Sequence, residues 1–596
     1  MIFPTLDELN TSRELIEVFG GYNHNLRIGD GEFYEMTNLT SSHYPVLSPR
    51  DKRGVFATPS SVQGIISKDA LCYVDGEDFV INEYRVPLGL STDPDDCPKK
   101  LVSMGAYVII LPDAKWVNTA SKTEAFENGS INQINSIDSA EVTITLTKQD
   151  GTAYEGFNAS PDEPSLPEGE TFANGTLWLD TSSSPHTLKQ YSEASGMWVA
   201  IPTVYVRIEA TGIGAGLNQY DGVQISGISA NNLATGVIKE QVDALEGTAV
   251  VQACDDNSIT IIGIIDEEVH LTGVNLTVSR QMPKMDFVIE SENRLWGCRY
   301  GIANNGEVVN EIYASKLGDF KNWNCFMGIS TDSYVASCGT DGAFTGAITH
   351  LGYPLFFKEN CLHKVFGNYP ANYQIQTTAC RGVEKGSGDS LAIVNELLYY
   401  KGRNGICVYD GSLPSEISHQ FGDRKYSNAV AGSHGNKYYV SMKDSLGEYH
   451  LFVYDAEKSL WHREDNTKVE AFCSHENNMF FINNGEIKTV FGNSEEDVEW
   501  SCESGTLGVS DPDRKYISRV NIRMKLDKDA SLTVYAEYDS DGEWHQVTEI
   551  YGTSLRAFSV AVMPRRCDHF RLKFVGKGNA KIYTLTKTIE QGSDIG

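Results

Sequence analysis

Residues 391–411 read LAIVNELLYYKGRNGICVYDG, and this stretch shows the pattern on which the fold prediction rests. A small-residue start leads into an apolar strand, and a polar turn separates that strand from a second one rich in aromatic residues. The same order recurs at 64–81, 100–117, 285–300, 346–367, 429–454 and 469–492. Four-stranded propeller blades repeat at about 40–50 residues, and most spacings between the later repeats lie near that length. The sequence therefore predicts a β-propeller.

Period-2 alternation of apolar residues indicates antiparallel strands almost everywhere after residue 21, with 54 glycines available for the turns. The alternation is clear at Val142, Ile144 and Leu146 and at Phe570, Leu572 and Phe574. We expect a mainly β fold: a six- to seven-bladed β-propeller with a β-rich insertion and a C-terminal β-sandwich. Because the repeats are degenerate, two or three unrelated sandwiches remain the competing interpretation.

Two interruptions of the repeat suggest domain boundaries. The repeat is absent between 117 and 285, and it stops near 500. We expect an N-terminal helix and ring-closing strand in 1–63, the first blades in 64–121, and one or two small inserted β domains in 122–280. The remaining blades are expected in 281–499 and a separate sandwich in 500–596.

The N-terminal segment has its own signals. Thr11 and Glu14 have capping-box spacing ahead of Gly20-Gly21, which predicts a short helix. The stretch from Leu26 to Phe33 suits the strand that closes a propeller ring. The basic residues Arg50, Lys52 and Arg53 are expected in a solvated or inter-subunit turn rather than at a DNA contact.

Composition excludes some function classes. Lys and Arg number 49 against 80 Asp and Glu, and the net charge of −31 argues against a surface that binds nucleic acid or anionic membrane by neutralising phosphate. The 12 cysteines lack the paired spacing of zinc sites, so we expect buried thiols in a reducing compartment, without structural zinc or disulfides. The longest apolar runs, such as Ala106–Leu111, are too short to span a bilayer, so no membrane span is expected.

Four short stretches match parts of known functional signatures. Gly388–Leu391 spells GDSL, a signature of esterases, but none of the 13 histidines has an aspartate three residues before it. The glycine-rich stretches 211–217 and 574–581 lack the spacing and the following helix of a phosphate-binding loop. Ser540–Trp544 matches part of the Asp-box turn of sialidases, but it occurs once and outside the propeller.

Acidic clusters and histidines offer no specific site. The pairs and triplets at 93–96, 255–256, 511–513 and 539–541 lack the twelve-residue calcium loop and are interpreted as solvated turns. His434 and His475 are expected to be surface or packing residues. With no nucleophile–base pair and no metal-ligand spacing, the sequence analysis concludes that the protein is not an enzyme and assigns no catalytic, cofactor-binding or metal residues.

Several stretches resemble virion proteins of tailed bacteriophages. NLRIGDGEFYEMTNLTSSHYPVLSPRDKRG (25–54) resembles the opening of their propeller-containing proteins, and NEIYASKLGDFKNWN (310–324) resembles the strand, Gly-Asp, then Trp element of tail-nozzle and packaged-DNA stabilisation proteins. The stretches 346–367 and 568–594 resemble a following blade and a C-terminal sandwich, and 175–201 resembles small hairpin modules of phage tail proteins. In physical terms, residues 310–324 supply a strand, a turn and a packing tryptophan that any propeller could contain.

The resemblance implies a structural tail protein, located in the virion tail and assembled in the host bacterial cytoplasm. It implies a ring of copies of the chain, expected to be a hexamer, which contacts the head–tail adaptor or other tail proteins. DNA would pass through this ring at ejection without specific binding, and an acidic wall would keep phosphate from adhering.

Two alternatives remain open. The first is a receptor-binding or glycan-binding virion protein, in which Trp178, Tyr191 and Trp198 would stack on sugars, although we favour these aromatic residues as the core of a small domain. The second is a glycosidase.

Overall fold

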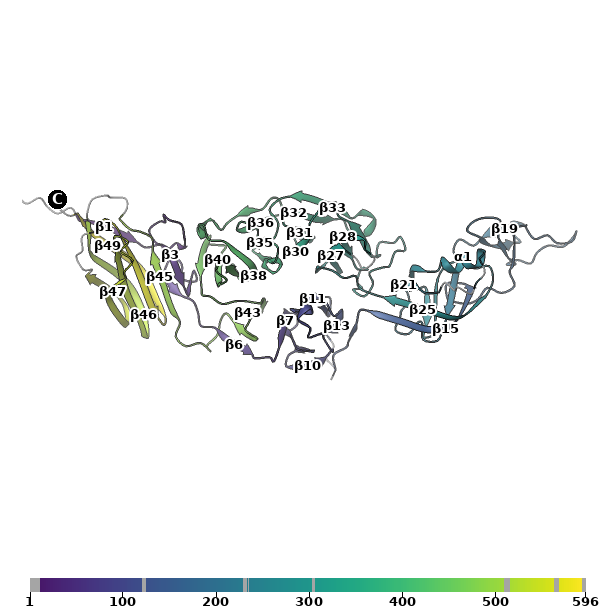
Figure 1. Ribbon diagram of the computed structural model, residues 1–596, viewed down its shortest axis with the longest axis horizontal. Coiled ribbons are helices and arrows are strands. Elements are labelled where there is room, and N and C mark those ends of the chain that lie inside the picture. The colour runs from purple at the N-terminus through teal and green to yellow at the C-terminus, as the bar shows by residue number, and fades with distance from the viewer. Residues whose placement is uncertain are drawn as a thin grey trace, which may run out of the picture. The chain divides into compact units, whose positions relative to one another are not determined.

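The computed structural model describes residues 11–120, 125–228, 233, 235–302, 306–508, 515–561 and 567–591. Within these ranges the protein is mainly antiparallel β structure, with helix α1 (Val237–Asp243) and short 3-10 turns between strands (Figure 1). Apolar residues at the alternating positions predicted above, such as Ile144 and Leu572, are buried. The chain divides into two compact units, residues 1–101, 342–364 and 377–596, and residues 102–341 and 365–376.

The fold is a β-propeller with an inserted β domain and a C-terminal sandwich, as predicted. Seven four-stranded sheets in the described residues are its blades. Four of them belong to the first unit: β7 (Val62–Ser67) to β10 (Tyr84–Pro87), β34 (Ala392–Val394) to β37 (Ser415–Glu416), β38 (Tyr426–His434) to β41 (Leu460–Arg463), and β42 (Ala471–His475), β43 (Asn478–Asn483) and β44 (Glu486–Thr489) with β6 (Gly54–Ala57).

Two further blades belong almost wholly to the second unit. They are β11 (Lys100–Met104) to β14 (Asn128–Ser130) and β26 (Phe287–Ser291) to β29 (Tyr334–Ser337). Trp116, Phe320 and Trp323 pack between these two blades in one apolar cluster. The remaining blade, β30 (Phe344–His350) to β33 (Gln374–Ala379), contributes strands to both units.

Strand β6 closes the propeller. It pairs with β44, Thr489 opposite Gly54 and Ile487 opposite Ala57, and so completes a blade that the chain begins more than 400 residues later. The prediction that the stretch from Leu26 to Phe33 closes the ring was therefore wrong. That stretch runs into β3 (Glu32–Thr37), which instead pairs with β45 (Glu499–Ser504) of the C-terminal sandwich, Phe33 opposite Ser504.

The predicted N-terminal helix was also wrong in the described residues, because Thr11–Ile16 forms strand β1. The edge of β49 (Ala580–Gln591) offers unpaired backbone groups, and β1 pairs antiparallel with it. Pairing along a whole sheet edge stabilises this segment as a strand by more than a helix cap, at about 1 kcal/mol, would stabilise it as a helix. Residues 1–10 lie outside the described residues.

The C-terminal sandwich is built around two long strands, β46 (Lys515–Tyr538) and β47 (His545–Ala561). β46 pairs with β49 along 515–526 and with β48 (Phe570–Lys577) along 531–538, so the sheet divides into two layers that share β46 and β47. Figure 1 shows these yellow strands with the purple β1 alongside. Both ends of the chain therefore build the same domain.

Two of the three basic residues that precede β6, Arg50 and Arg53, are not solvated. Arg53 is 5% exposed, and its guanidinium lies 2.6 Å from Glu464 Oε2 and 2.7 Å from Asp465 Oδ2. Arg50 binds Glu495 at 2.7 Å. The prediction of a solvated turn was wrong for the two arginines, because they pair with carboxylates beside the closing blade, whereas the Lys52 side chain is 40% exposed, as predicted. An inter-subunit contact of this turn stays a prediction.

The described residues of the insertion form two sheets. The larger has the order β22-β21-β25-β15-β20-β24-β23, in which the long strands β15 (Gln133–Thr147) and β25 (Val269–Arg280) lead the chain in and out. The others are β20 (Tyr205–Glu209), β21 (Gly222–Ser226), β22 (Gly247–Val250), β23 (Ala253–Asp255) and β24 (Ser258–Ile262). The smaller, which we call the hairpin module, contains β16 (Asn158–Ser160), β17 (Leu177–Asp180), β18 (Thr187–Ser192) and β19 (Met197–Ala200).

Candidate functional site

The GDSL stretch is a packed turn. Ser390 is fully buried, its hydroxyl accepts a hydrogen bond from the Lys401 amide at 2.9 Å, and its carbonyl accepts one from the Tyr438 hydroxyl at 2.8 Å. Asp389 pairs with Lys100 at 2.9 Å, and the nearby ammonium lowers the pKa of the Asp389 carboxyl. This serine is not presented to a substrate.

The other singled-out stretches are also structural. Residues 574–581 turn from β48 to β49, and Ser540–Trp544 lies between β46 and β47. In 211–217, a Cβ on Gly214 would lie 2.0 Å from the Asp255 carbonyl oxygen, so the glycine permits a close approach of two loops. None of these stretches forms a phosphate cradle.

The acidic clusters in the described residues stabilise turns, because their carboxylates accept hydrogen bonds from nearby backbone amides. Asp93 accepts from the Asp95 amide, and Asp539 accepts from the Asp568 amide at 2.7 Å. Residues 511–513 lie outside the described residues. His475 pairs with Ser67 of the neighbouring blade at 2.9 Å, and His434 packs on Phe491. The described part of the chain contains no group of three His, Cys, Asp or Glu side chains placed to hold a metal.

Trp178, Tyr191 and Trp198 form a small core, which is the interpretation that the sequence favoured over sugar stacking. The Trp198 ring centroid lies 5.6 Å from that of Trp178, 5.4 Å from Tyr191 and 5.0 Å from Phe172, all edge-on. Trp178 is 4% exposed, and Lys189 lies 4.7 Å above its ring. Because these rings pack on one another, they build the hairpin module rather than a binding platform.

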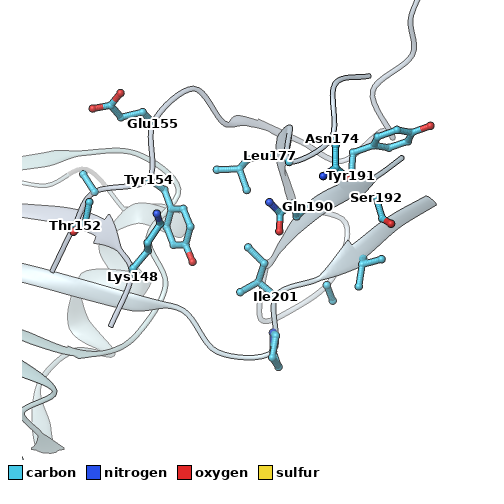
Figure 2. A pocket seen from close by; sticks show the side chains of 15 residues that line it. Lys148, Thr152, Tyr154, Glu155, Asn174, Leu177, Gln190, Tyr191, Ser192 and Ile201 are labelled. Atoms are coloured by element: carbon cyan, nitrogen blue, oxygen red, sulfur yellow. The ribbon is translucent and has the colours of Figure 1, made fainter. Parts of the chain in front are cut away.

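A cleft of about 920 Å³ lies between the hairpin module and the larger sheet of the insertion, within one compact unit. We call it the module cleft. One wall is the turn after β15, with Lys148, Thr152 and Tyr154, and the other is formed by the module. Figure 2 shows Lys148 and Tyr154 facing Leu177, Gln190 and Ile201 across open space, while Glu155 and Tyr191 point away. The volume lies within the range of about 300–1,000 Å³ that small-molecule sites occupy.

Tyr154 is the aromatic group of this cleft. It is half-buried, and the Lys148 ammonium lies 6.0 Å from the centroid of its ring. Burial, together with the nearby Tyr205 and Asp150, raises the pKa of the Tyr154 hydroxyl. The hydroxyl therefore stays protonated at neutral pH and can donate a hydrogen bond.

The two walls are fixed to one another. His186 of the module binds Asp266 of the larger domain at 2.7 Å, and Gln241 of α1 donates to the same carboxylate at 2.7 Å. Leu179 and Leu188 of the module are buried in the same apolar cluster as the larger sheet. A cleft whose walls share a core is largely preformed, which lowers the ordering cost of binding.

Sequence reasoning missed this cleft. Its lining comes from segments near 148–155, 174–177, 190–192 and 199–202, none of which carries a recognisable signature. The pairing of β17 with β18 and of β18 with β19 assembles the module wall, and the packing of the module on the larger sheet brings that wall opposite 148–155. The aromatic residues that the sequence analysis singled out, Trp178, Tyr191 and Trp198, belong to the core of the module and not to the cleft-facing side chains.

Comparisons with known proteins give fold-level similarity. No protein-family profile matches the chain, and no curated protein matches it. Among solved structures, an exo-β-1,3-galactanase from Phanerochaete chrysosporium is 8% identical, with half of this chain and 94% of that one aligned and a TM-score of 0.21. An arabinoxylan arabinofuranohydrolase of glycoside hydrolase family 43 from Bacillus subtilis is 10% identical, with the same coverages and a TM-score of 0.19. A sialidase from Trypanosoma rangeli is 7% identical over 91% of this chain and 96% of that one, with a TM-score of 0.20.

These matches correct one conclusion of the sequence analysis. That analysis concluded that the protein is not an enzyme, whereas the matched structures are glycoside hydrolases and a sialidase. The conclusion is contradicted, and we withdraw it. Because the identities do not exceed 10% and the TM-scores do not exceed 0.21, we transfer no residue role from these enzymes to this chain.

The described residues contain no helix with the length and apolarity needed to cross a membrane.

Proposed function

We propose that the protein binds a glycan in the module cleft, in agreement with the receptor- or glycan-binding alternative of the sequence analysis. The observation that carries this proposal is the position of Tyr154, a half-buried aromatic ring that borders a preformed cleft of about 920 Å³ opposite an amide side chain.

The apolar part of the cleft suits the faces of sugar rings. A pyranose presents C–H groups on its faces, which pack on an aromatic ring, and hydroxyl groups around its rim. Tyr154 offers such a ring, and Leu177 and Ile201 face it across the cleft (Figure 2). An apolar lining with a few placed polar groups is the usual make-up of small-molecule sites.

The polar part of the cleft suits sugar hydroxyls. Gln190 and Asn174 carry amides, each able to donate and accept, and Thr152 and Ser192 carry hydroxyls. Gln190 is exposed and faces Tyr154 across the cleft. A ligand lying on the Tyr154 ring would therefore meet hydrogen-bonding groups along its edge.

The test is a glycan array probed with the full chain, followed by calorimetric titration of the strongest ligands. Replacing Tyr154 by alanine should weaken binding by roughly 2 kcal/mol, or roughly 30-fold, as expected for a central aromatic contact. Tyr84→Ala serves as a control, because Tyr84 is 66% exposed on an outer blade strand far along the chain from the cleft residues. Equal binding by wild type and Tyr154→Ala, or no glycan bound by the wild type, would refute the proposal.

A further inference from the structure

We propose that the ligand is an extended neutral polysaccharide, which continues from the module cleft into a second cleft beside Tyr220. This inference rests on the proposed function and extends it. The second cleft has a volume of about 790 Å³ and is formed by three loops of the insertion, at 148–150, 217–220 and 252–254. We call it the Tyr220 cleft.

The two clefts adjoin at one turn. Lys148 borders both, Thr152 and Tyr154 line the module cleft, and Gln149 and Asp150 line the Tyr220 cleft. The turn is held by the Lys148 amide, which donates to the Thr152 carbonyl at 2.9 Å, and by the Thr152 amide, which donates to Asp150 at 2.9 Å. A chain ligand that passes over Lys148 can therefore occupy both clefts.

Tyr220 is an aromatic residue held in an uncommon backbone conformation. Its φ is +68°, which is rare for a residue with a bulky side chain and persists where the surroundings impose it. Its amide donates to the Val251 carbonyl at 2.7 Å, and Lys316 donates to its carbonyl at 3.2 Å. The Lys316 ammonium also lies 5.6 Å from the ring centroid, yet the residue remains 38% exposed.

Amides surround this ring. Gln149 donates to the side chain of Gln252 at 3.1 Å, and Gln219 donates to the Gln252 carbonyl at 2.8 Å. Gln252 is 1% exposed, so it fixes the two exposed glutamines beside Tyr220. An exposed aromatic ring with oriented amides repeats the chemistry of the module cleft.

Charge indicates the class of polysaccharide. The acidic and basic side chains that line the two clefts are Lys148, Glu155 and Asp150, and Lys316 lies against the Tyr220 ring, which gives two cations and two anions. Hydrogen bonds from Thr152 lower the pKa of the Asp150 carboxyl, which keeps it ionised at neutral pH. A polyanionic chain would meet no excess of positive charge, so a neutral chain is favoured over one rich in uronic or sialic acid.

The test uses size-graded oligosaccharides from neutral glucan, mannan and galactan, with oligogalacturonides as the acidic comparison. The wild type should bind longer neutral oligomers at least about tenfold more tightly than short ones. Tyr220→Asn should remove most of this gain and leave short-oligomer binding unchanged, whereas Tyr154→Ala should weaken both. Asparagine tolerates a positive φ, so this variant removes the ring without adding backbone strain.

The outcomes separate the two proposals. If Tyr220→Asn binds long oligomers as the wild type does, the second cleft is not used and the proposed function stands. A preference for oligogalacturonides overturns the neutral assignment. If the wild type binds none of the oligomers and nothing on the array, both proposals fail. Equal thermal unfolding of wild type and variant confirms that lost binding is not lost folding.

Discussion

Replacing Arg53 by methionine should loosen the closure of the propeller. Strand β6 contributes few buried apolar groups, since Val55 is 47% and Phe56 50% exposed. The ion pairs of Arg53 with Glu464 and Asp465 lie directly before this strand. Burial alone would lower the pKa of the Arg53 guanidinium, but the two carboxylates raise it overall, so the pairing is strong.

The magnitude follows from burial. Removing one partner of a buried pair typically destabilises by about 3–5 kcal/mol, because the other charge is left uncompensated. Glu464 is 4% exposed and would keep only Arg50, whose Nε lies 3.9 Å from its Oε2, so we expect the lower end of this range, about 3 kcal/mol. Lys52 provides a matched control one residue away: it pairs with Asp497 at 2.8 Å, but both side chains are 40% or more exposed. Lys52→Met should therefore cost only about 0–1 kcal/mol.

The assay is hydrogen exchange read by mass spectrometry on peptides that contain β6 and β44, since a multi-domain chain has no single unfolding transition. In Arg53→Met, exchange there should be faster by roughly 150-fold or more, the factor given by ~3 kcal/mol. Adding Glu464→Gln should restore part of the protection by removing the orphaned charge. Equal exchange in Arg53→Met and Lys52→Met would refute the reasoning.

Three further outcomes are expected. Burial raises the pKa of the Asp465 carboxyl, but Arg53 and Thr467 outweigh it and lower that pKa below 3.8; Arg50 and Arg53 likewise lower the pKa of Glu495 below 4.5 against burial. The closure is thus fully stabilised above these values and loses stability as pH falls through the lower folded-state pKa values. The ratio of exchange rates between Arg53→Met and wild type in the peptides of β6 and β44, measured at a series of pH values, should therefore narrow below about pH 4. Trp198→Ala should destabilise the hairpin module by about 3–5 kcal/mol and abolish glycan binding together with module protection in hydrogen exchange. Antibody labelling of virions by electron microscopy should place the chain at peripheral tail tips if it binds a receptor, whereas axial label and a hexamer in mass photometry would support the conduit prediction.

The blades could be predicted from the sequence because the strands of each blade mostly follow one another closely along the chain. The stretch 391–411 contains three of the four strands of its sheet, separated by short turns at Asn395-Glu396 and near Gly402–Gly405. Asn395 and Glu396 adopt positive φ, as tight hairpin turns require. Alternation, turn residues and spacing are all visible within about 20 residues of such a unit.

The closure and the clefts could not be predicted in the same way, because they depend on partners distant in sequence. Arg50 and Arg53 look like surface charge until Glu464, Asp465 and Glu495 are placed beside them, more than 400 residues along the chain. Tyr154 has no local signature either, because it becomes a cleft residue only when the module packs on the larger sheet, through contacts such as His186 with Asp266, 80 residues apart.

The stretch 310–324 joins the insertion to the propeller, which gives a physical reason for its strand, Gly-Asp, then Trp order. Asn322 is fully buried; its side chain donates to Asp221 at 2.9 Å and accepts from the Gly222 amide at 2.8 Å. Asp221 also pairs with the buried Arg280, and Lys316 of the same stretch supports Tyr220. A buried polar network of this kind fixes geometry, because each unpaired member would be costly. The residue next to Tyr220 is thus tied directly to a blade through Asn322, in addition to the connection that the long strands β15 and β25 provide.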